Sequence, residues 1–225
     1  MRPSLLMLVS AAVAACGGTP AAAVQANAQE QPIASDSLAR VELADLATTI
    51  PGIVLDIRYA TPANFTGAPL PGYGVPRAFL RREAAAALAR VQARLAVRGY
   101  GLKVWDGYRP VRATLAMVAW CERTGRTSLL DDGYIARRSR HNQGVAIDLT
   151  VVELASGREL EMGTPFDEFS IRSHTANAAG AAAEHRRLLG EAMAAEGFVN
   201  YVNEWWHFSF AVPDPIPFDL PLDRW

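Results

Sequence analysis

The sequence has few cysteines, little net charge and no long hydrophobic run, and each shortage excludes a class of protein. Two cysteines in 225 residues are too few for a disulfide scaffold or a four-cysteine zinc site. A formal net charge of -1 argues against nucleic-acid binding, which needs a basic stripe. The hydrophobic share of 50% argues against disorder and suffices for a buried core. At about 150 residues per domain, the length favours one domain, or at most one and a half.

The first fifteen residues have the pattern of an export signal. Arg2 supplies a positive charge, and the apolar run over 5–15 is shorter than the roughly 20 residues that span a bilayer. The run ends in Val13-Ala14-Ala15-Cys16, which resembles the lipobox of bacterial lipoproteins, where the cysteine is lipidated and becomes the new N-terminus. An ordinary signal peptide, cut at a later site such as Ala26-Asn27-Ala28, is the alternative.

This N-terminus implies a domain layout. We expect a signal peptide over 1–15, a flexible tether over 16–35 that begins with the lipidated Cys16, and one folded domain over 36–225. Such a chain would lie in the periplasm or cell envelope, held to the membrane by its lipid. The other cysteine, Cys121, lies in a helical pattern with no histidine beside it, so we expect a buried thiol rather than a nucleophile.

Hydrophobic periodicity predicts a mixed α+β domain. Strand patterns occupy residues 53–59, 102–105, 145–152, 198–202 and 206–212. Helical patterns occupy residues 83–97, 110–123 and 181–196. Within the second helix, we expect Leu115, Val118 and Ala119 to share a face. Because strands and helices do not alternate regularly, we expect an antiparallel sheet flanked by helices.

One chemically informative motif runs from Ser139 to Asp148. His141 lies in a loop, and Asp148 follows seven residues later inside an otherwise apolar strand pattern. A carboxylate among apolar neighbours is costly to bury unless it is paired or binds a metal. Strand alternation places Asp148 on the face of Ala146 and Thr150, so a solvated face is the alternative.

A second motif, Glu204-Trp205-Trp206-His207, places a carboxylate three residues before a histidine. Residues three apart in a regular strand point to opposite faces. Glu204 must therefore lie at a bend before the strand if both groups serve one site, and Asn203 suits such a bend. A histidine packed in an aromatic core is the alternative for His207.

A third motif, Trp105-Asp106-Gly107-Tyr108-Arg109-Pro110, fixes an arginine at the start of a helix. A surface arginine at a helix end is its alternative. The three motifs together contain two histidines and one carboxylate, which form a catalytic zinc set when a fourth position stays open to water. Glu204 would then be the general base, and Arg109 would neutralise the oxyanion of the tetrahedral intermediate.

The first two motifs resemble those of zinc D-alanyl-D-alanine peptidases. Three more stretches are similar to the D-alanyl-D-alanine dipeptidase branch, which includes the vancomycin-resistance dipeptidases. These stretches are Asp-Gly-Tyr-Arg-Pro at 106–110, Arg-Tyr-Ala-Thr with Asn-Phe-Thr-Gly at 58–67, and Met-Gly-Thr-Pro-Phe-Asp at 162–167. The resemblance covers about residues 40–225, so the domain over 36–225 would be a zinc D,D-dipeptidase domain.

The resemblance implies a role for each matching residue. The ligands of one Zn²⁺ per chain would be His141, Asp148 and His207, with Glu204 as the base and Arg109 at the reaction centre. The substrate-binding residues would be Asp167, Ser139, Tyr59 and Tyr73. Asp167 would pair with the free ammonium group of the dipeptide. Asp106 would orient Arg109 from behind, or would instead cap the turn at Gly107.

The implied activity is zinc-dependent hydrolysis of D-alanyl-D-alanine to free D-alanine, in peptidoglycan-related salvage or turnover. A D,D-carboxypeptidase that trims muropeptide stems is one alternative. A lipoprotein that binds wall peptides without catalysis is another, although the intact Glu204 speaks against it. We expect a structural role for His174 and a surface position for His185, and neither is expected to bind the metal.

Overall fold

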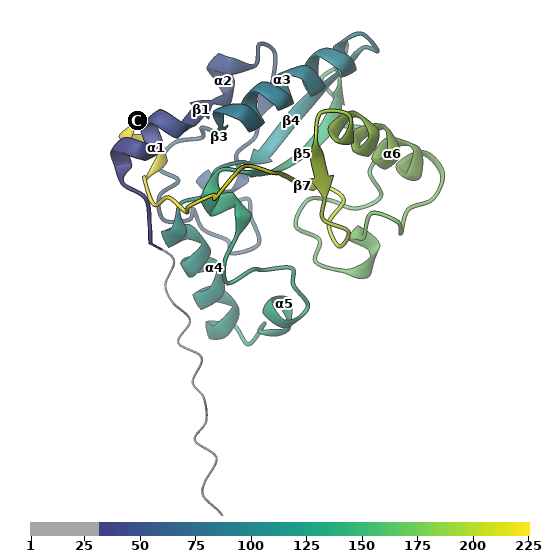
Figure 1. Cartoon of the computed structure of the whole chain (residues 1–225). Helices are drawn as coiled ribbons and strands as arrows, with labels where there is room; N and C mark the ends of the chain where they lie inside the picture. The colour runs from purple at the N-terminus through teal and green to yellow at the C-terminus, as the bar shows by residue number, and fades with distance from the viewer. Residues whose placement is uncertain (1–31) are drawn as a thin grey trace, which may run out of the picture. The chain divides into compact units, whose positions relative to one another are not determined.

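A five-stranded mixed sheet carries the fold (Figure 1). The computed structural model describes residues 32–225, so the predictions for the signal peptide, for Cys16 and for most of the tether lie outside the described residues. The strand order is β2-β4-β5-β7-β6. These strands are β2 (Val54–Leu55), β4 (Tyr100–Asp106), β5 (Ala146–Glu153), β7 (His207–Phe210) and β6 (Phe198–Asn200). The predicted α+β class is confirmed, but the expected all-antiparallel sheet is not, because β2 pairs with β4 in parallel.

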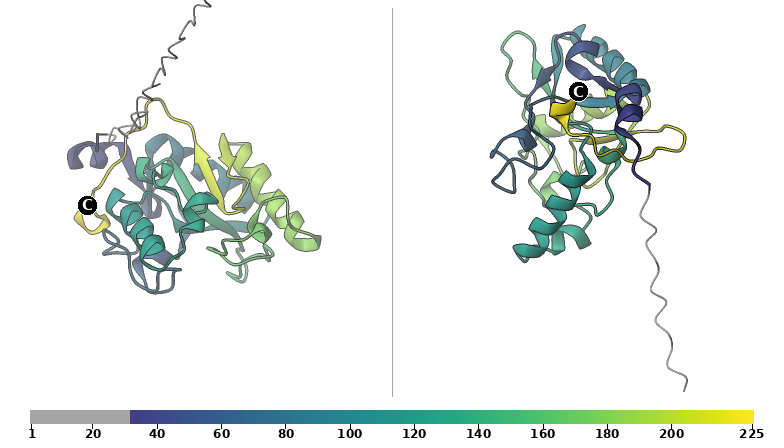
Figure 2. Two further views of the ribbon diagram at one scale, coloured as in Figure 1. Left: turned by 90° about the horizontal axis from the view of Figure 1, so that it is seen from below. Right: turned by 90° about the vertical axis from the view of Figure 1, so that its left-hand side faces the viewer.

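A small second sheet and six helices complete the described chain. The antiparallel pair β1 (Leu43–Asp45) and β3 (Phe79–Arg81) forms the second sheet. The helices are α1 (Asp36–Glu42), α2 (Leu46–Thr49), α3 (Arg82–Ala96), α4 (Val111–Arg123), α5 (Ser128–Asp131) and α6 (Gly180–Ala194). Helices α3 and α6 contact each other and the large sheet, whereas α4 and α5 lie on the opposite side of the domain (Figures 1 and 2). Within residues 32–225, none of these helices is both long and apolar enough to span a bilayer.

The central strand β5 is buried along almost its whole length. Every residue from Ala146 to Val152 is buried, and only the last residue, Glu153, is partly exposed. Asp148 is 3% exposed, which excludes the solvated face that the sequence left open. A carboxylate at this depth needs compensating partners.

The predicted strand over 53–59 is too long. Only Val54 and Leu55 pair with β4, and the chain then enters the 3₁₀ turn η1 (Arg58–Ala60). The Asp56 backbone N–H still donates to the Val104 carbonyl at 2.9 Å, and its carboxylate pairs with Arg58 and Lys103, both at 2.9 Å. The turn η1 directs Tyr59 into the core, where it is 2% exposed.

The predicted face of α4 is wrong for two of its three residues, since only Val118 is buried. Leu115 is 58% exposed and Ala119 is exposed, whereas Ala113, Met117 and Cys121 are fully buried. These three are spaced by four residues, so they form a single stripe along the helix. Cys121 is thus the buried thiol that the sequence predicted.

Candidate active site

His141 is held by a short, closely capped 3₁₀ helix, η2 (Arg140–Gln143). The Ser139 hydroxyl accepts a hydrogen bond from the His141 backbone N–H at 3.2 Å, and the Asn142 side chain accepts one from the Ser139 N–H at 3.2 Å. This reciprocal capping box fixes the start of the turn. The Asn142 amide also donates to the Arg109 carbonyl at 2.9 Å, so η2 is joined to the arginine segment.

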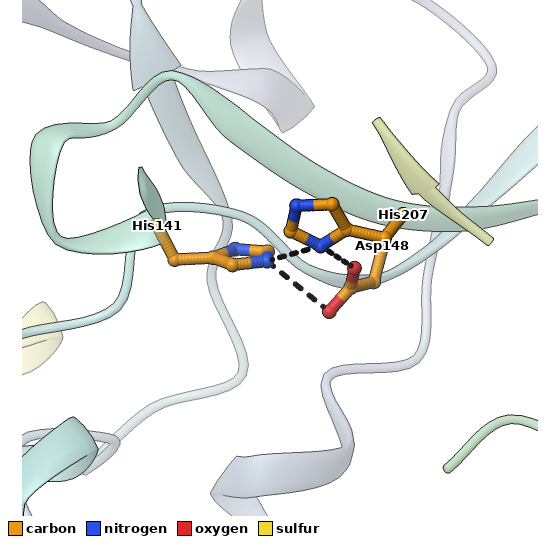
Figure 3. A group of neighbouring side chains, drawn as sticks. All are labelled: His141, Asp148 and His207. Carbon is orange, nitrogen blue, oxygen red and sulfur yellow. Dashed lines mark hydrogen bonds and ion pairs between the residues drawn. The ribbon is translucent and has the colours of Figure 1, made fainter. Parts of the chain in front are cut away.

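Asp148 and His207 lie directly opposite each other on β5 and β7, so their side chains meet on one face of the sheet. His207 Nδ1 is 2.9 Å from Asp148 Oδ1, and His141 Nε2 is 3.1 Å from His207 Nδ1 and 3.3 Å from Asp148 Oδ2 (Figure 3). The ligand atoms of these three residues lie within 4.8 Å of one another. The structure therefore brings together the three side chains that the sequence predicted as metal ligands.

The cluster fits a tetrahedral metal ion. Ligand atoms around zinc at bond lengths of about 2.0–2.2 Å are separated by roughly 3.3–3.6 Å, close to the spacings seen here. His141 Nδ1 lies 2.7 Å from the Gly107 carbonyl. Donation to that carbonyl places the ring proton on Nδ1 and leaves the Nε2 lone pair directed at the other two ligands.

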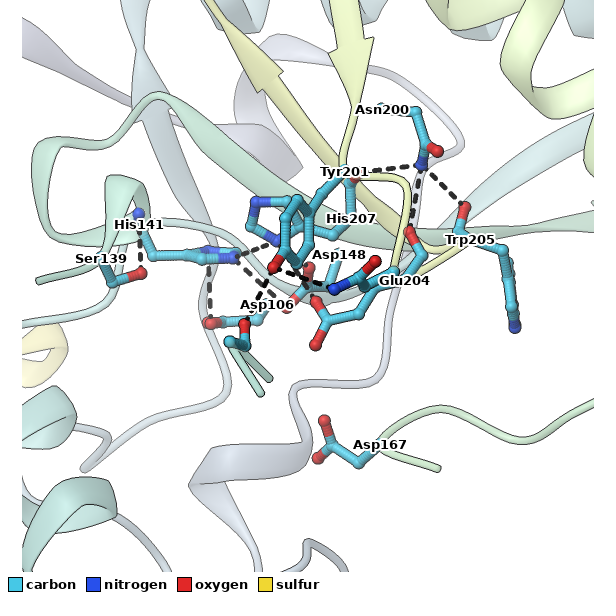
Figure 4. Close-up of polar contacts among 12 residues, drawn as sticks. Asp106, Ser139, His141, Asp148, Asp167, Asn200, Tyr201, Glu204, Trp205 and His207 are labelled. Atoms are coloured by element: carbon cyan, nitrogen blue, oxygen red, sulfur yellow. Dashed lines mark hydrogen bonds and ion pairs between the residues drawn. The ribbon is translucent and has the colours of Figure 1, made fainter. Parts of the chain in front are cut away.

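Glu204 lies at the bend that the spacing argument required. The turn before β7 is closed by hydrogen bonds from the Glu204 N–H to the Tyr201 carbonyl at 3.0 Å and from the His207 N–H to the Glu204 carbonyl at 3.2 Å. The Asn200 amide donates to the carbonyls of Glu204 at 3.1 Å and His207 at 3.0 Å (Figure 4). Glu204 therefore reaches the metal cluster, with Oε2 3.9 Å from His207 Nδ1.

Arg109 is buried behind the cluster and is oriented by Asp106. Its Nε and one terminal nitrogen lie 2.9 and 2.8 Å from Asp106 Oδ2, and the terminal nitrogen is 3.8 Å from Asp148 Oδ2. The guanidinium also lies 5.1 Å from the centre of the Tyr59 ring. Asp106 contacts Arg109 and His141 Nδ1, the latter at 3.4 Å. Its geometry matches the orienting role better than the turn-capping one.

A cavity of about 380 Å³ opens in front of the cluster. Its lining includes the three metal-ligand candidates together with Tyr59, Arg109, Ser139, Asp167 and Glu204. Asp167 adopts a left-handed backbone conformation with φ 61°, and both of its carboxylate oxygens lie 3.1 Å from the Tyr59 hydroxyl, which donates to them.

The structure places Tyr73 differently from the sequence prediction. The ring is buried and does not line the cavity, and its hydroxyl donates to Asp106 Oδ1. Because Asp106 draws the phenol inward, Tyr73 supports Arg109 from behind instead of touching the cavity.

Several lining residues were not identified from the sequence. They are Leu130, Gly133, Tyr134, Ile135, Ala136, Arg137, Arg138, Arg140, Phe169, Tyr201 and Trp206. The run of arginines at 137–140 was a visible signal in the sequence, whereas nothing local marked Tyr134 or Tyr201. Tyr134 contacts His174 at 3.0 Å, which gives that histidine a structural partner.

The electrostatics divide the buried carboxylates into two kinds. Burial favours a raised pKa for Asp148, but His141 and His207 outweigh it and hold the pKa well below its usual range. Burial raises the pKa of Glu204 well above its usual value, and the charges of Asp148 and Asp167 add to the effect. Burial also raises the pKa of Asp167, and it lowers that of His207, which favours the neutral imidazole that binds metals.

A histidine–aspartate–histidine cluster beside a buried glutamate is the arrangement of a metal-dependent hydrolase. The family model described as D-Ala-D-Ala dipeptidase, peptidase family M15, matches residues 39–217, and the chain belongs to this family. The predicted family is thereby confirmed.

Curated relatives agree with the family. A D-alanyl-D-alanine dipeptidase of Enterococcus faecalis is 39% identical over 181 residues, which cover 74% of this chain and 89% of the relative. The Streptomyces coelicolor enzyme of the same name is 38% identical, over 77% of this chain and 94% of its own. That of Escherichia coli is 34% identical, over 81% and 91%. Among solved structures, the vancomycin-resistance D,D-pentapeptidase VanY gives a TM-score of 0.36 at 19% identity, over 59% of this chain and 73% of that one.

Proposed function

We propose that this chain is a zinc-dependent D-alanyl-D-alanine dipeptidase, which adds water to the free dipeptide and releases two molecules of D-alanine. The observation that carries the proposal is the meeting of His141, Asp148 and His207 with the buried Glu204 in one cavity, in a chain of the D-Ala-D-Ala dipeptidase family. A cavity of about 380 Å³ lies in the range of small-molecule sites and suits a dipeptide.

The donor set of two imidazole nitrogens and one carboxylate fits zinc. When bound by these residues, zinc would lower the pKa of a coordinated water toward about 7 and would polarise the carbonyl of the scissile bond. His141 and His207 would hold the ion in their neutral forms, and Asp148 would supply the anionic ligand.

The remaining steps belong to the side chains around the cluster. Glu204 accepts a proton from the attacking water and delivers it to the nitrogen of the leaving D-alanine. Its raised pKa makes it a better proton acceptor than an exposed glutamate. Arg109, held by Asp106, stabilises the negative charge that develops on the carbonyl oxygen.

The cavity also matches the two charged ends of the substrate. Asp167 supplies an anion for the free ammonium group, and the hydroxyl of Tyr59 orients that carboxylate. The same cavity is lined by Arg137, Arg138 and Arg140, which give a carboxylate terminus a cationic environment. A long peptide has no ammonium group at this point, so Asp167 favours the dipeptide.

The direct test compares substrates on the purified, zinc-loaded protein. We expect hydrolysis of D-alanyl-D-alanine, a much slower reaction or none with a pentapeptide that ends in the same two residues, and about one zinc per chain. A chelator should abolish the activity and zinc should restore it. Turnover of the pentapeptide alone would favour the D,D-carboxypeptidase, and activity in protein free of transition metal would remove the metal mechanism.

We further propose that the enzyme is exported and held to the membrane through a lipid on Cys16, where it would act in salvage or turnover of wall peptides. The support is the sequence of residues 1–16, with its apolar run and its lipobox-like end. In a bacterial host, the wild-type chain should fractionate with membranes, and Cys16→Ser should be released into the soluble fraction. An unchanged distribution of the variant would contradict lipidation.

A further inference from the structure

Arg186 on α6 is a buried cation whose hydrogen bonds, among residues 32–225, all go to backbone carbonyls. It is 4% exposed. Its guanidinium donates to the carbonyls of Met162 at 2.7 Å, His174 at 2.7 Å and Arg172 at 3.1 Å. Within the described part of the chain it forms no ion pair. Burying a charge is costly, and these three hydrogen bonds compensate it together with the nearby negative charge of Glu168.

The three carbonyls bracket Asp167. Met162 precedes it by five residues, and Arg172 and His174 follow it by five and seven. Asp167 itself has φ 61°, in the left-handed region, which aspartate enters more readily than most residues other than glycine. One side chain therefore ties both ends of the loop that presents the carboxylate to the cavity.

The same loop is hydrogen-bonded to the turn before β7, which carries the proposed general base Glu204. The Trp205 backbone N–H donates to the Ser173 carbonyl at 3.0 Å, and its indole N–H donates to Thr164 Oγ1 at 2.8 Å. The Arg186 guanidinium lies 5.7 Å from the centre of the Trp205 ring. Figure 4 shows Glu204 turned toward the metal cluster and Trp205 turned away from it, so the loop is attached to the back of the base-bearing turn.

We propose that Arg186 is a positioning residue for substrate selection, which fixes the distance between Asp167 and the metal cluster by holding the 162–174 loop against α6 and Trp205. This inference rests on the proposed dipeptidase function, because the distance that it sets is the one between the ammonium group and the scissile bond. Arg186 does not line the cavity, so it acts on the substrate only through Asp167.

Only arginine has the required geometry. Its planar fork supplies five N–H donors in fixed directions, whereas lysine offers a single ammonium group. Gly163 admits the close approach: a Cβ built there would lie 3.3 Å from a terminal nitrogen of Arg186, and its φ of +87° already disfavours a side chain. Both the guanidinium of Arg186 and the missing side chain at Gly163 are therefore needed for this close approach.

The test is the full zinc-loaded chain with Arg186→Lys, which keeps the charge but cannot reach three carbonyls. We expect the KM for D-alanyl-D-alanine to rise about tenfold, because a displaced Asp167 loses its charge-assisted contact with the ammonium group, with little change in kcat and in zinc content. The Ki of N-acetyl-D-alanyl-D-alanine, which lacks the ammonium group, should not change. Arg187→Lys is the matched control, because Arg187 is an exposed neighbour that pairs with Glu191.

A second variant and a second measurement cover the other outcomes. Gly163→Ala crowds both Arg186 and Ala182 and strains the backbone at φ +87°, so it loosens the loop without removing the guanidinium and should raise the KM in the same selective way. Amide hydrogen exchange over residues 162–174 should quicken in both variants whether or not the wild type hydrolyses the dipeptide. Unchanged KM and exchange, or a parallel rise of KM and Ki, would overturn the inference. A wild type inactive on the dipeptide would instead count against the proposed function.

Discussion

The sheet side of the cavity and its loop side hold their buried carboxylates differently. On the sheet side, Asp148 faces two histidines and Asp106 faces Arg109, so each negative charge has a positive or polarisable partner. On the loop side, Asp167 accepts hydrogen bonds from a phenol, and Glu204 has no hydrogen bond to its carboxylate among the described residues. The pKa of Asp148 is lowered accordingly, whereas those of Glu204 and Asp167 are raised.

This difference separates carboxylates whose charge is already balanced by the protein from carboxylates whose charge is not. The sheet-side charges are compensated within the protein, which suits residues that must hold an ion in place. The loop-side carboxylates are buried without a full counter-charge, and acids whose pKa is raised in this way are typical of functional sites. Under the proposed function, the ammonium group of the substrate would supply the missing positive charge at Asp167, and a proton from water would supply it at Glu204.

The largest effect is expected on the sheet side. Asp148→Asn keeps the shape of the side chain but removes the anionic ligand, so both bound zinc and dipeptide hydrolysis should be lost to the limit of detection. Zinc content and turnover are measured on the same preparation. The control is Asp219→Asn, since Asp219 pairs with Arg112 at the surface. Stoichiometric zinc in the Asp148 variant would contradict the comparison.

The next effect separates the two sides. Glu204→Gln removes the proton acceptor but no metal ligand, so kcat should fall by about 10²–10⁴-fold, the usual contribution of a general base, while zinc stays bound. Glu191→Gln changes an exposed carboxylate on α6 and should alter neither quantity. Loss of zinc from the Glu204 variant would show that Glu204 helps to hold the metal, as the sheet-side residues do. An unchanged kcat would show that it is not the general base.

A smaller effect tests the coupling within the loop side. A raised carboxyl pKa means that Glu204 is protonated, and inactive as a base, up to a higher pH than an ordinary glutamate. Asp167 contributes to that shift in the substrate-free site, so Asp167→Asn should move the acid limb of kcat/KM to lower pH, as expected when one of two interacting acids is removed. The same variant should raise the KM by about tenfold, because an ion pair with the ammonium group is lost. The pH profile of kcat/KM distinguishes the two effects, and an acid limb that stays in place would show that the carboxylates titrate independently.

The metal cluster was predictable because its ligands lie in short motifs whose residue types and spacing are visible in the sequence. Asp148 interrupts an apolar strand, and the three-residue spacing of Glu204 and His207 demanded a bend that the turn before β7 provides. Strand pairing then brings Asp148 and His207 together whatever the rest of the fold does. The α+β class followed from the same periodicity.

What failed depends on contacts between distant parts of the chain. Two stripes of apolar residues are possible on α4, and packing against the rest of the domain decides between them: the one with Met117 is buried, whereas Leu115 is exposed. The clamp at Arg186 also spans separate segments, since its acceptors lie 12 to 24 residues earlier. The assigned roles of Arg109, Ser139 and Asp167 stay predictions until the variants are measured.

The smallest expected effect concerns Tyr73, whose position the sequence misjudged. Tyr73→Phe leaves Asp106 without the hydrogen bond from the phenol, but Asp106 keeps both of its contacts to Arg109, so kcat should fall only a few-fold. KM should not change, because the ring does not line the cavity. The control is Tyr108→Phe, which removes a buried hydrogen bond to the Leu220 carbonyl, outside the cavity lining, and should lower stability without lowering kcat. A rise in KM at constant kcat would indicate that Tyr73 binds the substrate after all. Asp106 alone would then hold Arg109 in place.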